Sequence, residues 1–544
     1  MMLLGTAMLP ASAQISVGGI PYGLRTALDR STIPTVHPAA FDADAVAAQD
    51  AQREAAHKIP LYARLLPLNV DLNSAGAWTD LPNGDRLWRL RVESDGAKAT
   101  ELYYEDLHLP SGASLYLYDD AGGQLIGGFT AANERASGRF TTSQLLGASC
   151  ILEYYEPHAV AGQGYFRIAR VGHAYRFVRA AGAKAAEACE VDVNCSEGAA
   201  WTAQRDGVVR ISVVDDQGAG WCSGSLVNNV LQDCRAYYLT ANHCGPDATT
   251  AQLEDWKFYF GYQRPNCGTG TAFANHSVQG CVLRGSSNDN GGDNGSDFLL
   301  LEGDDPIPDN YNPYWLGWDA SGSVTSTGVS IHHPNGDEKK ISTYTSSPTS
   351  STFGGVPNTH WLVHWSATAN GHGVTEPGSS GSPLFNNAHR IIGTLSGGGS
   401  DCDTPTFPDF YGKMSYHWQS DPGPTAERLK HWLDPNNSGI LTMDGSYGPC
   451  GTLDVSDKTD VAALPGLYPN PATDRVTIVF PESTEGIDRV EVLDLTGRVV
   501  SSFAPLTTGR AELNVQGWSA GMYVVRLLSN GTRAASAPLN VIAP

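Results

Sequence analysis

The sequence predicts a mainly β protein built from several domains. Its 544 residues exceed what one compact core usually holds, and 41% of them are apolar, as in ordinary globular proteins. Along most of the chain, short apolar runs are separated by Gly, Pro, Asn and Asp. We therefore expect an α+β segment first, an all-β barrel or sandwich in the middle, and a small β-sandwich last.

The start of the chain, residues 1–13, looks like a secretory signal peptide. An apolar run in MMLLGTAMLPASAQ leads to Ala11-Ser12-Ala13, which has the small-residue pattern of a cleavage site. No Lys or Arg precedes this run, which departs from the usual pattern. No later stretch approaches the roughly 20 uninterrupted apolar residues of a membrane-spanning helix, so we expect no transmembrane segment.

Residues 14–184 form the predicted α+β segment. The stretch DADAVAAQDAQREAAHK is rich in Ala and favours a helix, whereas LWRLRVESDG, ATELYYEDLHLP, SLYLYDD and CILEYYEP favour strands. The segment runs into FVRAAGAKAAEAC, whose small and polar residues are typical of a linker or a processing site.

The middle domain, residues 185–447, contains most of the cysteines. The chain has ten, and eight of them lie between 189 and 402. Metal ligation is the alternative role for such a group, but the sequence has no CxxC pair. In an exported protein this pattern favours disulfides.

After SYGPCG the composition changes to that of a linker, which we assign to residues 448–464. Residues 465–544 then alternate apolar and polar positions in several short runs with turns between them, such as DRVTIVF and GMYVVRLLSNG. This pattern predicts a β-sandwich, for which a generic carbohydrate-binding or adhesive module is one interpretation.

The formal net charge is −22. Nucleic acids and anionic membranes attract basic surfaces, so we expect neither as the main partner. An acidic surface suits a cationic substrate, although it is also common on secreted proteins that bind none.

The stretch TEPGSSGSPLF, residues 375–385, predicts a tight turn that runs into an apolar strand. A nucleophilic serine requires a base and backbone N–H groups aimed at the developing oxyanion. On this turn, Ser380 is the candidate nucleophile, and the amides of Gly378 and Ser380 are the candidate oxyanion hole. A Ser- and Gly-rich surface loop without function is the alternative.

A second stretch, YYLTANHCG, supplies the candidate base His243 at the end of an apolar strand. Cys244 follows it directly, and Cys222 lies upstream in GWCSGSLV, so a disulfide between them would hold the loop that carries His243.

A third stretch, GSDFLLLEG, places Asp297 where a polar loop enters an apolar run. A carboxylate there is unfavourable unless it is paired, and a hydrogen bond to His243 would orient that base. The preceding loop, SSNDNGGDNGSD, could instead bind calcium, but its oxygen spacing fits no EF-hand loop.

Four motifs together resemble the bacterial lysyl endopeptidases: GWCSGSLVNN with YYLTANHCG, GSDFLLLE, IHHPNGDEKKIS and VTEPGSSGSPLF. The resemblance covers about residues 185–445. It implies a chymotrypsin-like double β-barrel in which Ser380 is the nucleophile, His243 the general base and Asp297 the residue that orients it. It also implies the disulfides Cys189–Cys402, Cys195–Cys267 and Cys222–Cys244. Cys234 and Cys281 are left over and are expected to pair with each other, whereas Cys150 and Cys450 stay unassigned.

The resemblance also indicates the residues that bind substrate. It places a carboxylate shortly before a Tyr-Gly step, which makes Asp409 the expected partner of a substrate lysine, with Asp401 and Asp403 as nearby competitors. Trp365 matches a Trp near the catalytic histidine, and Ser396 stands where the family has a histidine. His332 and His333 match a family motif, and we interpret them as structural residues rather than zinc ligands.

The flanking segments resemble known parts of exported proteases. Residues 14–184 are similar to the family's propeptide, which assists folding and blocks the site, and Lys184-Ala185 is a plausible self-cleavage point. The tail, with PNPA, TGR and GMYVVR, resembles the C-terminal sorting domain of the type IX secretion system. This implies export to the medium or to the outer-membrane surface of a Gram-negative bacterium, with that secretion machinery as a partner.

The sequence therefore predicts a secreted serine endopeptidase that cleaves protein and peptide substrates after Lys, or after Lys and Arg, without a metal or other cofactor. A chymotrypsin-like endopeptidase of glutamyl or broad specificity is one alternative. An inactive surface adhesin that kept the protease scaffold is the other.

Overall fold

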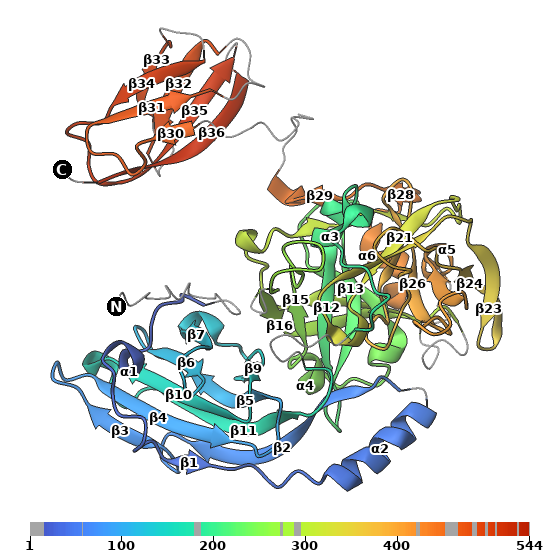
Figure 1. Ribbon diagram of the computed structural model, residues 1–544, viewed down its shortest axis with the longest axis horizontal. Coiled ribbons are helices and arrows are strands. Elements are labelled where there is room, and N and C mark those ends of the chain that lie inside the picture. The colour runs from blue at the N-terminus through green and yellow to red at the C-terminus, as the bar shows by residue number, and fades with distance from the viewer. Residues whose placement is uncertain are drawn as a thin grey trace. The chain divides into compact units, whose positions relative to one another are not determined.

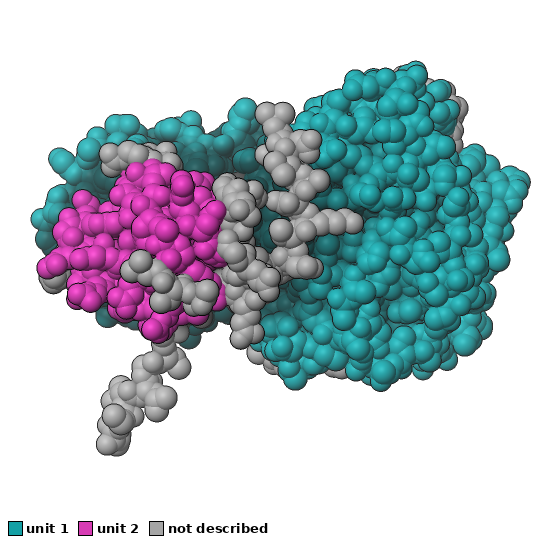
Figure 2. Space-filling model, turned by 90° about the horizontal axis from the view of Figure 1, so that it is seen from above, with its two compact units in different colours: residues 1–452 teal, residues 453–544 magenta. Residues whose placement is uncertain are grey.

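The computed structural model describes residues 16–56, 58–178, 186–272, 276–287, 295–419, 425–451, 466–480, 487–494, 499–505, 509–529 and 532–542. The chain divides into two compact units, Met1–Thr452 and Leu453–Pro544, which Figure 2 distinguishes by colour. The division falls inside the predicted linker 448–464. The other predicted domain boundaries stay predictions, and the proposed signal peptide lies outside the described residues.

The N-terminal segment combines two helices with a curved sheet (Figure 1). The helices are α1 (Tyr22–Arg25) and α2 (Ala43–Ala55). Helix α2 begins at Asp42, whose carboxylate accepts a hydrogen bond from the Ala45 amide at 3.0 Å and thereby caps the free N–H groups of the first turn. The sheet contains β1 (Thr35–Val36), β3 (Ala77–Asp80), β4 (Arg86–Glu93), β6 (Ser114–Tyr118), β7 (Leu125–Phe129) and β10 (Ser149–Glu156).

A second, larger sheet joins the N-terminal segment to the middle domain. Its N-terminal strands are β2 (Leu61–Asp71), β5 (Ala99–His108), β8 (Phe140–Thr141), β9 (Leu145–Leu146) and β11 (Tyr165–Ala174). Its middle-domain strands are β12 (Val208–Val214), β13 (Ala219–Val227), β14 (Tyr237–Ala241), β15 (Lys257–Tyr259), β16 (Ser277–Gln279), β17 (Cys281–Ser286) and β18 (Phe298–Gly303). The connection is the pairing of β2 with β13, where Ala63 lies opposite Ala219.

The rest of the middle domain forms another sheet. It contains β20 (Trp318–Asp319), β21 (Gly328–His332), β22 (Lys340–Tyr344), β23 (Thr349–Phe353), β24 (Val356–Val363), β25 (Pro383–Asn386), β26 (Ile391–Gly398), β27 (Asp409–Lys413) and β28 (Thr442–Met443). This sheet is antiparallel except for the parallel pairing of β20 with β26. A short pair, β19 (Tyr314–Trp315) and β29 (Ser446–Tyr447), lies apart from it. The expected mainly β class is confirmed, and the two sheets of the middle domain correspond to the two barrels of the expected chymotrypsin-like fold.

Short helices occupy the connections of the first unit. The α-helices are α3 (Thr202–Gly207), α4 (Thr250–Leu253), α5 (Met414–His417) and α6 (Leu429–Leu433). The 3₁₀ turns are η1 (Ala131–Asn133), η2 (His158–Val160), η3 (Ser196–Gly198), η4 (Asn242–Cys244), η5 (Asp309–Tyr311), η6 (Pro334–Gly336), η7 (Thr425–Glu427) and η8 (Pro449–Gly451).

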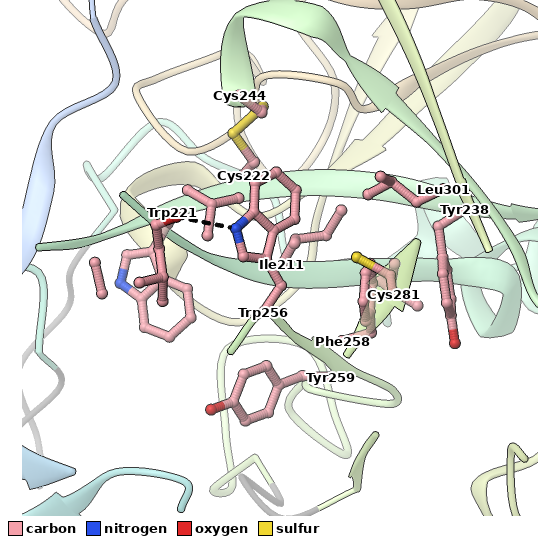
Figure 3. Packing of buried hydrophobic residues seen from close by; sticks show 14 of the residues in the cluster. Ile211, Trp221, Cys222, Tyr238, Cys244, Trp256, Phe258, Tyr259, Cys281 and Leu301 are labelled. Carbon is pink, nitrogen blue, oxygen red and sulfur yellow. Dashed lines mark hydrogen bonds between the residues drawn. A yellow bond between two sulfur atoms is a disulfide. The ribbon is translucent and has the colours of Figure 1, made fainter. Parts of the chain in front are cut away.

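Aromatic residues dominate the core of the first middle-domain sheet. Figure 3 shows Tyr238 stacked on Phe258, with ring centroids 3.9 Å apart, beside Trp256 and Cys281. Large buried rings of this kind supply much of the burial that stabilises a sheet. The same cluster holds the Cys222–Cys244 disulfide, which lies at the end of the sheet where β14 leads into η4.

The second unit is a small β-sandwich, as the alternating pattern predicts. One sheet contains β30 (Gly466–Tyr468), β31 (Arg475–Val479) and β34 (Arg510–Asn514), and the other contains β32 (Arg489–Leu493), β33 (Val499–Phe503), β35 (Gly521–Ser529) and β36 (Thr532–Val541). Apolar residues from both sheets, including Ile478 and Val492, form one shared core. In the described part of the chain, every helix is too short or too polar to cross a membrane.

Candidate active site

His243 and Asp297 meet because β14 and β18 are neighbours, with Ala241 opposite Phe298. The His243 Nδ1 atom lies 2.7 Å from one carboxylate oxygen of Asp297, and the backbone N–H of His243 donates to the other at 2.8 Å. The Asp297 side chain is fully buried. Because a carboxylate accepts the Nδ1 proton, the unprotonated nitrogen of the neutral ring is Nε2, as a general base requires.

The backbone of Asp297 is unusual for a residue with a side chain, since its φ is +60°. Such a conformation is uncommon outside glycine and persists where the surroundings hold it. The Asn242 amide donates to the Asp297 carbonyl at 3.1 Å, which ties the backbones of the two loops together. This strained residue lies at the functional contact that the sequence predicts.

The serine turn lies against the loop that carries His243. Gly381 has a φ of +79°, and a Cβ atom there would lie 2.0 Å from Thr240 Oγ1 and 2.6 Å from the Ala241 amide. The Ser380 carbonyl accepts from the Ser223 amide at 2.8 Å and lies 3.9 Å from Cys244 Sγ. Ser380 is therefore brought to the same edge as His243. Among the described residues, its hydroxyl makes no hydrogen bond, to His243 or to another group.

The turn before Ser380 is held by its own hydrogen bonds and by close packing. Gly378 has a φ of +94°, and a Cβ there would lie 3.0 Å from the Gly336 amide. The Ser223 hydroxyl donates to the Gly378 carbonyl at 2.9 Å, and the Ser379 amide donates to the Glu376 carbonyl. Within the described part of the chain, the amides of Gly378 and Ser380 have no acceptor.

Asp409 lies at the start of β27 and is fully buried. One of its oxygens accepts from Trp365 Nε1 at 2.6 Å, from the Thr375 hydroxyl at 2.8 Å and from the Ser400 hydroxyl at 2.6 Å. Burial raises the pKa of the Asp409 carboxyl above its ordinary value, although these donors oppose the shift. The structure thus brings Asp409 and Trp365 together. The sequence interpretation missed Thr375 and Ser400, although Thr375 opens the serine motif itself.

Ser396 occupies a bulge in β26, where it interrupts the pairing with β27. It hydrogen-bonds to His360 Nε2 at 3.0 Å. Burial lowers the pKa of His360 to about 4, so its ring is neutral at physiological pH. Ser396 stands at the position where we expect the family to have a histidine. The imidazole of His360, on β24, lies beside that position. The sequence offered no signal for this contact, because the two residues lie far apart in the chain.

His332 and His333 are fully buried and lie beneath the serine turn. His332 bonds to the hydroxyls of Ser379 and Ser342 through its two nitrogens, and burial lowers its pKa to about 3. His333 Nδ1 bonds to the Asp337 carbonyl at 2.9 Å. These contacts hold both rings in place, and the structural role that we expect for them stays a prediction.

Three of the four expected disulfides are present: Cys189–Cys402, Cys195–Cys267 and Cys222–Cys244. The expected Cys234–Cys281 pairing is wrong, because Cys234 pairs with Cys450. Cys281 instead points into the aromatic core, 3.6 Å from the Leu253 carbonyl (Figure 3), and Cys150 is a buried free thiol. The Cys234–Cys450 bond ties the end of the first unit to the loop after β13.

Two expectations fall on residues that the structure does not describe. The predicted processing point, Lys184-Ala185, lies outside the described residues, as does most of the loop considered for calcium, 288–294. Among the described residues, one group has the spacing of metal ligands, namely Glu187, Glu376 and Cys402. Cys402 is disulfide-bonded, so its sulfur is no thiolate ligand.

Comparison with known proteins gives two family matches. Residues 183–412 match the family model described as lysyl endopeptidase, C-terminal domain. The middle domain resembles the lysyl endopeptidases. A curated lysyl endopeptidase of Pseudomonas aeruginosa is 32% identical to this chain over 248 residues, which cover 42% of this chain and 51% of the relative. The chain thus spans about half the length of that relative.

The tail matches a second family model. Residues 466–537 match a secretion system C-terminal sorting domain, which indicates an exported protein. Solved structures that are similar to the chain include a thermostable serine protease from an extremophilic microorganism, 15% identical, covering 41% of this chain and all of that one with a TM-score of 0.28. A Glu endopeptidase, also 15% identical, covers 39% of this chain and 87% of its own with a TM-score of 0.25.

Proposed function

We propose that the chain is an exported serine endopeptidase that cleaves after Lys, or after Lys and Arg. The observation that carries this proposal is the 2.7 Å contact between His243 and Asp297 at the edge where the Ser380 turn lies. The lysyl endopeptidase-like domain and its 32% identical relative support it.

The proposed reaction is acyl transfer in two steps. The Ser380 hydroxyl attacks the scissile carbonyl while His243 Nε2 takes its proton, and Asp297 stabilises the resulting imidazolium. The amides of Gly378 and Ser380 donate to the oxyanion. His243 then gives the proton to the leaving amine, and water hydrolyses the acyl-enzyme by the same route. In enzymes without bound substrate, the hydrogen bond between base and nucleophile is often long and tightens only when substrate binds. A Ser380 hydroxyl without a hydrogen bond is therefore compatible with this mechanism.

The preference for Lys is assigned to Asp409. Its carboxylate is buried, and a substrate ammonium would supply the positive charge that the described neighbours Trp365, Thr375 and Ser400 lack. The raised pKa of the Asp409 carboxyl fits this role, because a bound cation would favour the ionised form.

The flanks receive roles in maturation and export. We assign residues 14–184 to a propeptide that is removed at Lys184-Ala185, and residues 465–544 to recognition by the type IX secretion machinery, with support from the tail's family match.

The test combines an activity probe with a peptide panel. A fluorophosphonate probe should label the processed protein at Ser380, and Ser380→Ala should abolish labelling. Peptides that differ only before the scissile bond should show cleavage after Lys, and Asp409→Asn should reduce that cleavage more than cleavage after uncharged residues. If the probe labels the protein but cleavage occurs mainly after Glu, the chain would instead be a glutamyl endopeptidase. Absence of labelling in folded, processed protein would favour the inactive adhesin.

A further inference from the structure

Ser223 follows Cys222 on β13 and contacts the serine turn through two of its groups. Its backbone N–H donates to the Ser380 carbonyl at 2.8 Å, and its hydroxyl donates to the Gly378 carbonyl at 2.9 Å. Ser223 is fully buried. One residue therefore holds the carbonyls of the residues before and after Ser379.

A second contact fixes the direction of the Ser223 hydroxyl. The His333 amide donates to Ser223 Oγ at 3.0 Å. A carbonyl can only accept, so the hydroxyl is the donor in its contact with Gly378. His333 is itself fully buried. A hydroxyl that accepts from one fixed group and donates to another has little freedom to rotate, so it constrains the peptide that it contacts.

Two further carbonyls of the turn have donors of their own. The Asn335 amide donates to the Pro377 carbonyl at 2.5 Å, and the Ser382 amide donates to the Ser379 carbonyl at 2.9 Å. In a trans peptide the carbonyl and the following N–H point in opposite directions. A carbonyl that is held on one side therefore directs the next N–H to the other side, and in both cases the next N–H is one of the proposed oxyanion amides.

Gly378 is the most easily rotated residue of this turn. It has a φ of +94°, which glycine reaches without strain but also leaves easily, because it has no Cβ to restrict it. The direction of its N–H is fixed when the peptides on both sides are held, and the Ser223 hydroxyl holds the second of them. Without that hydroxyl, the Gly378 carbonyl and the His333 amide, which are both buried, would lose this contact.

Ser223 also connects the turn to the strand that leads to His243. The Thr240 hydroxyl donates to the Ser223 carbonyl at 2.7 Å. The residue before Ser223, Cys222, is disulfide-bonded to Cys244, which follows the base. The turn of the nucleophile and the loop of the base are thus attached to the same part of β13.

We propose that Ser223 is a positioning residue for the oxyanion hole, and that its hydroxyl keeps the Gly378 peptide turned so that the amides of Gly378 and Ser380 face the substrate carbonyl. The proposal rests on the proposed function, since it takes these two amides as the oxyanion donors. The full negative charge on that oxygen exists only in the tetrahedral intermediate. Loss of the Ser223 hydroxyl therefore weakens binding of the transition state more than binding of the substrate.

The first experiment compares the kinetics of Ser223→Ala and Ser225→Ala. Ser225 lies two positions further along β13 and is equally buried, but its hydroxyl has no hydrogen-bond partner among the described residues. Each variant removes one buried hydroxyl from the same strand, so an effect that both share reports on packing alone. With the peptide amide that the parent cleaves best, Ser223→Ala should lower kcat by about 10- to 100-fold and change KM by about twofold at most. Ser225→Ala should leave both constants near the parent values. Equal kcat in the two variants, or a change in KM alone, would overturn the proposal.

The second experiment follows the turn itself, without relying on activity. In the full chain carrying Ser380→Ala, amide hydrogen exchange is measured by mass spectrometry on peptides that cover residues 376–384. Adding Ser223→Ala should accelerate exchange there by about tenfold, because the turn opens locally more often, whereas adding Ser225→Ala should not. Equal exchange in the two variants would overturn the proposal. If the parent cleaves no peptide and no probe labels it, the proposed function fails, whereas the exchange rates still decide whether Ser223 holds the turn.

Discussion

At the scale of single residues, Gly381 is where the serine turn packs closely against the end of the strand before His243. We expect Gly381→Ala to abolish most activity and to destabilise the protein, because the added Cβ would lie 2.0 Å from Thr240 Oγ1 and 2.6 Å from the Ala241 amide. The left-handed backbone adds strain of about 1 kcal/mol or more. Thermal unfolding and the labelling rate of Ser380 measure the two effects.

The chain offers a matched control at Gly439, which has a φ of +80° and open space around its Cβ position. Gly439→Ala introduces the same backbone strain without the contact. If the two variants lose equal stability and both keep activity, the close approach of the two loops is not what positions Ser380.

Glu376 should make stability depend on pH. Burial raises the pKa of its carboxyl from 4.5 to about 7, so the folded state holds a proton that the unfolded chain releases. Its contribution to stability is complete below the unfolded pKa and is lost as the pH rises through about 7. Glu376→Gln stays neutral, so its melting temperature should rise relative to that of the parent between about pH 5 and pH 8.

This comparison uses the unprocessed chain with Ser380→Ala, so that cleavage at Lys184-Ala185 does not affect the result. The other charged groups that face Glu376 are Glu187, Glu190, Asp337 and Lys340, and they are the same in both proteins. A difference in melting temperature that stays constant over this pH range would mean that Glu376 is ionised in the folded state throughout.

The predictions for single residues succeeded where burying a charged group without a partner would be unfavourable. A carboxylate at the mouth of an apolar strand requires a partner, and Asp297 has one in His243. The composition of GSSGSP predicted a tight turn, but not the close approach of Gly381 to Thr240 and Ala241. Ser400 and His360 were not predictable in this way, because a hydroxyl or a buried imidazole is common in many environments and only the fold brings it to Asp409 or Ser396.

At the scale of elements, several ion pairs join the N-terminal segment to the middle domain, and in one of them both side chains are fully buried. Lys257 Nζ on β15 lies 3.0 Å from Glu101 on β5, and both side chains are fully buried. Removing the charge in Glu101→Gln leaves Lys257 buried without its counterion, which costs about 3–5 kcal/mol for pairs of this kind. We expect a clear fall in the melting temperature of the first unit, measured by calorimetry on the full chain.

An exposed pair serves as the control. Arg390 contacts Asp444 at 2.9 Å, but Asp444 is 78% exposed, so Asp444→Asn should change stability by about 0–1 kcal/mol. Equal effects of Glu101→Gln and Asp444→Asn would show that the junction of the two segments contributes little to stability.

The helices and strands were predicted better than the pairing of strands and of cysteines. Helix α2 and most strands follow from local composition and alternation. The pairing of β2 with β13 does not, because strand pairing between distant segments depends on which edges meet rather than on the pattern within each strand. The same reason explains the wrong Cys234–Cys281 pairing. Loop cysteines at 234 and 450 meet only after folding, whereas Cys281 faces the core from β17.

At the scale of the whole molecule, the chain combines a lysyl endopeptidase-like domain with a secretion sorting domain. The N-terminal segment shares a sheet with the middle domain, and the two parts belong to one compact unit. The acidic surplus, with a net charge of −22, suits cationic substrates at long range.

The most direct test of the account is to digest a complex protein mixture with the processed chain and to identify the new C-termini by mass spectrometry. The account predicts new termini that end in Lys, with a smaller share in Arg, and none when the digest uses Ser380→Ala. New termini dominated by Glu or by uncharged residues, or an identical pattern with Ser380→Ala, would contradict it.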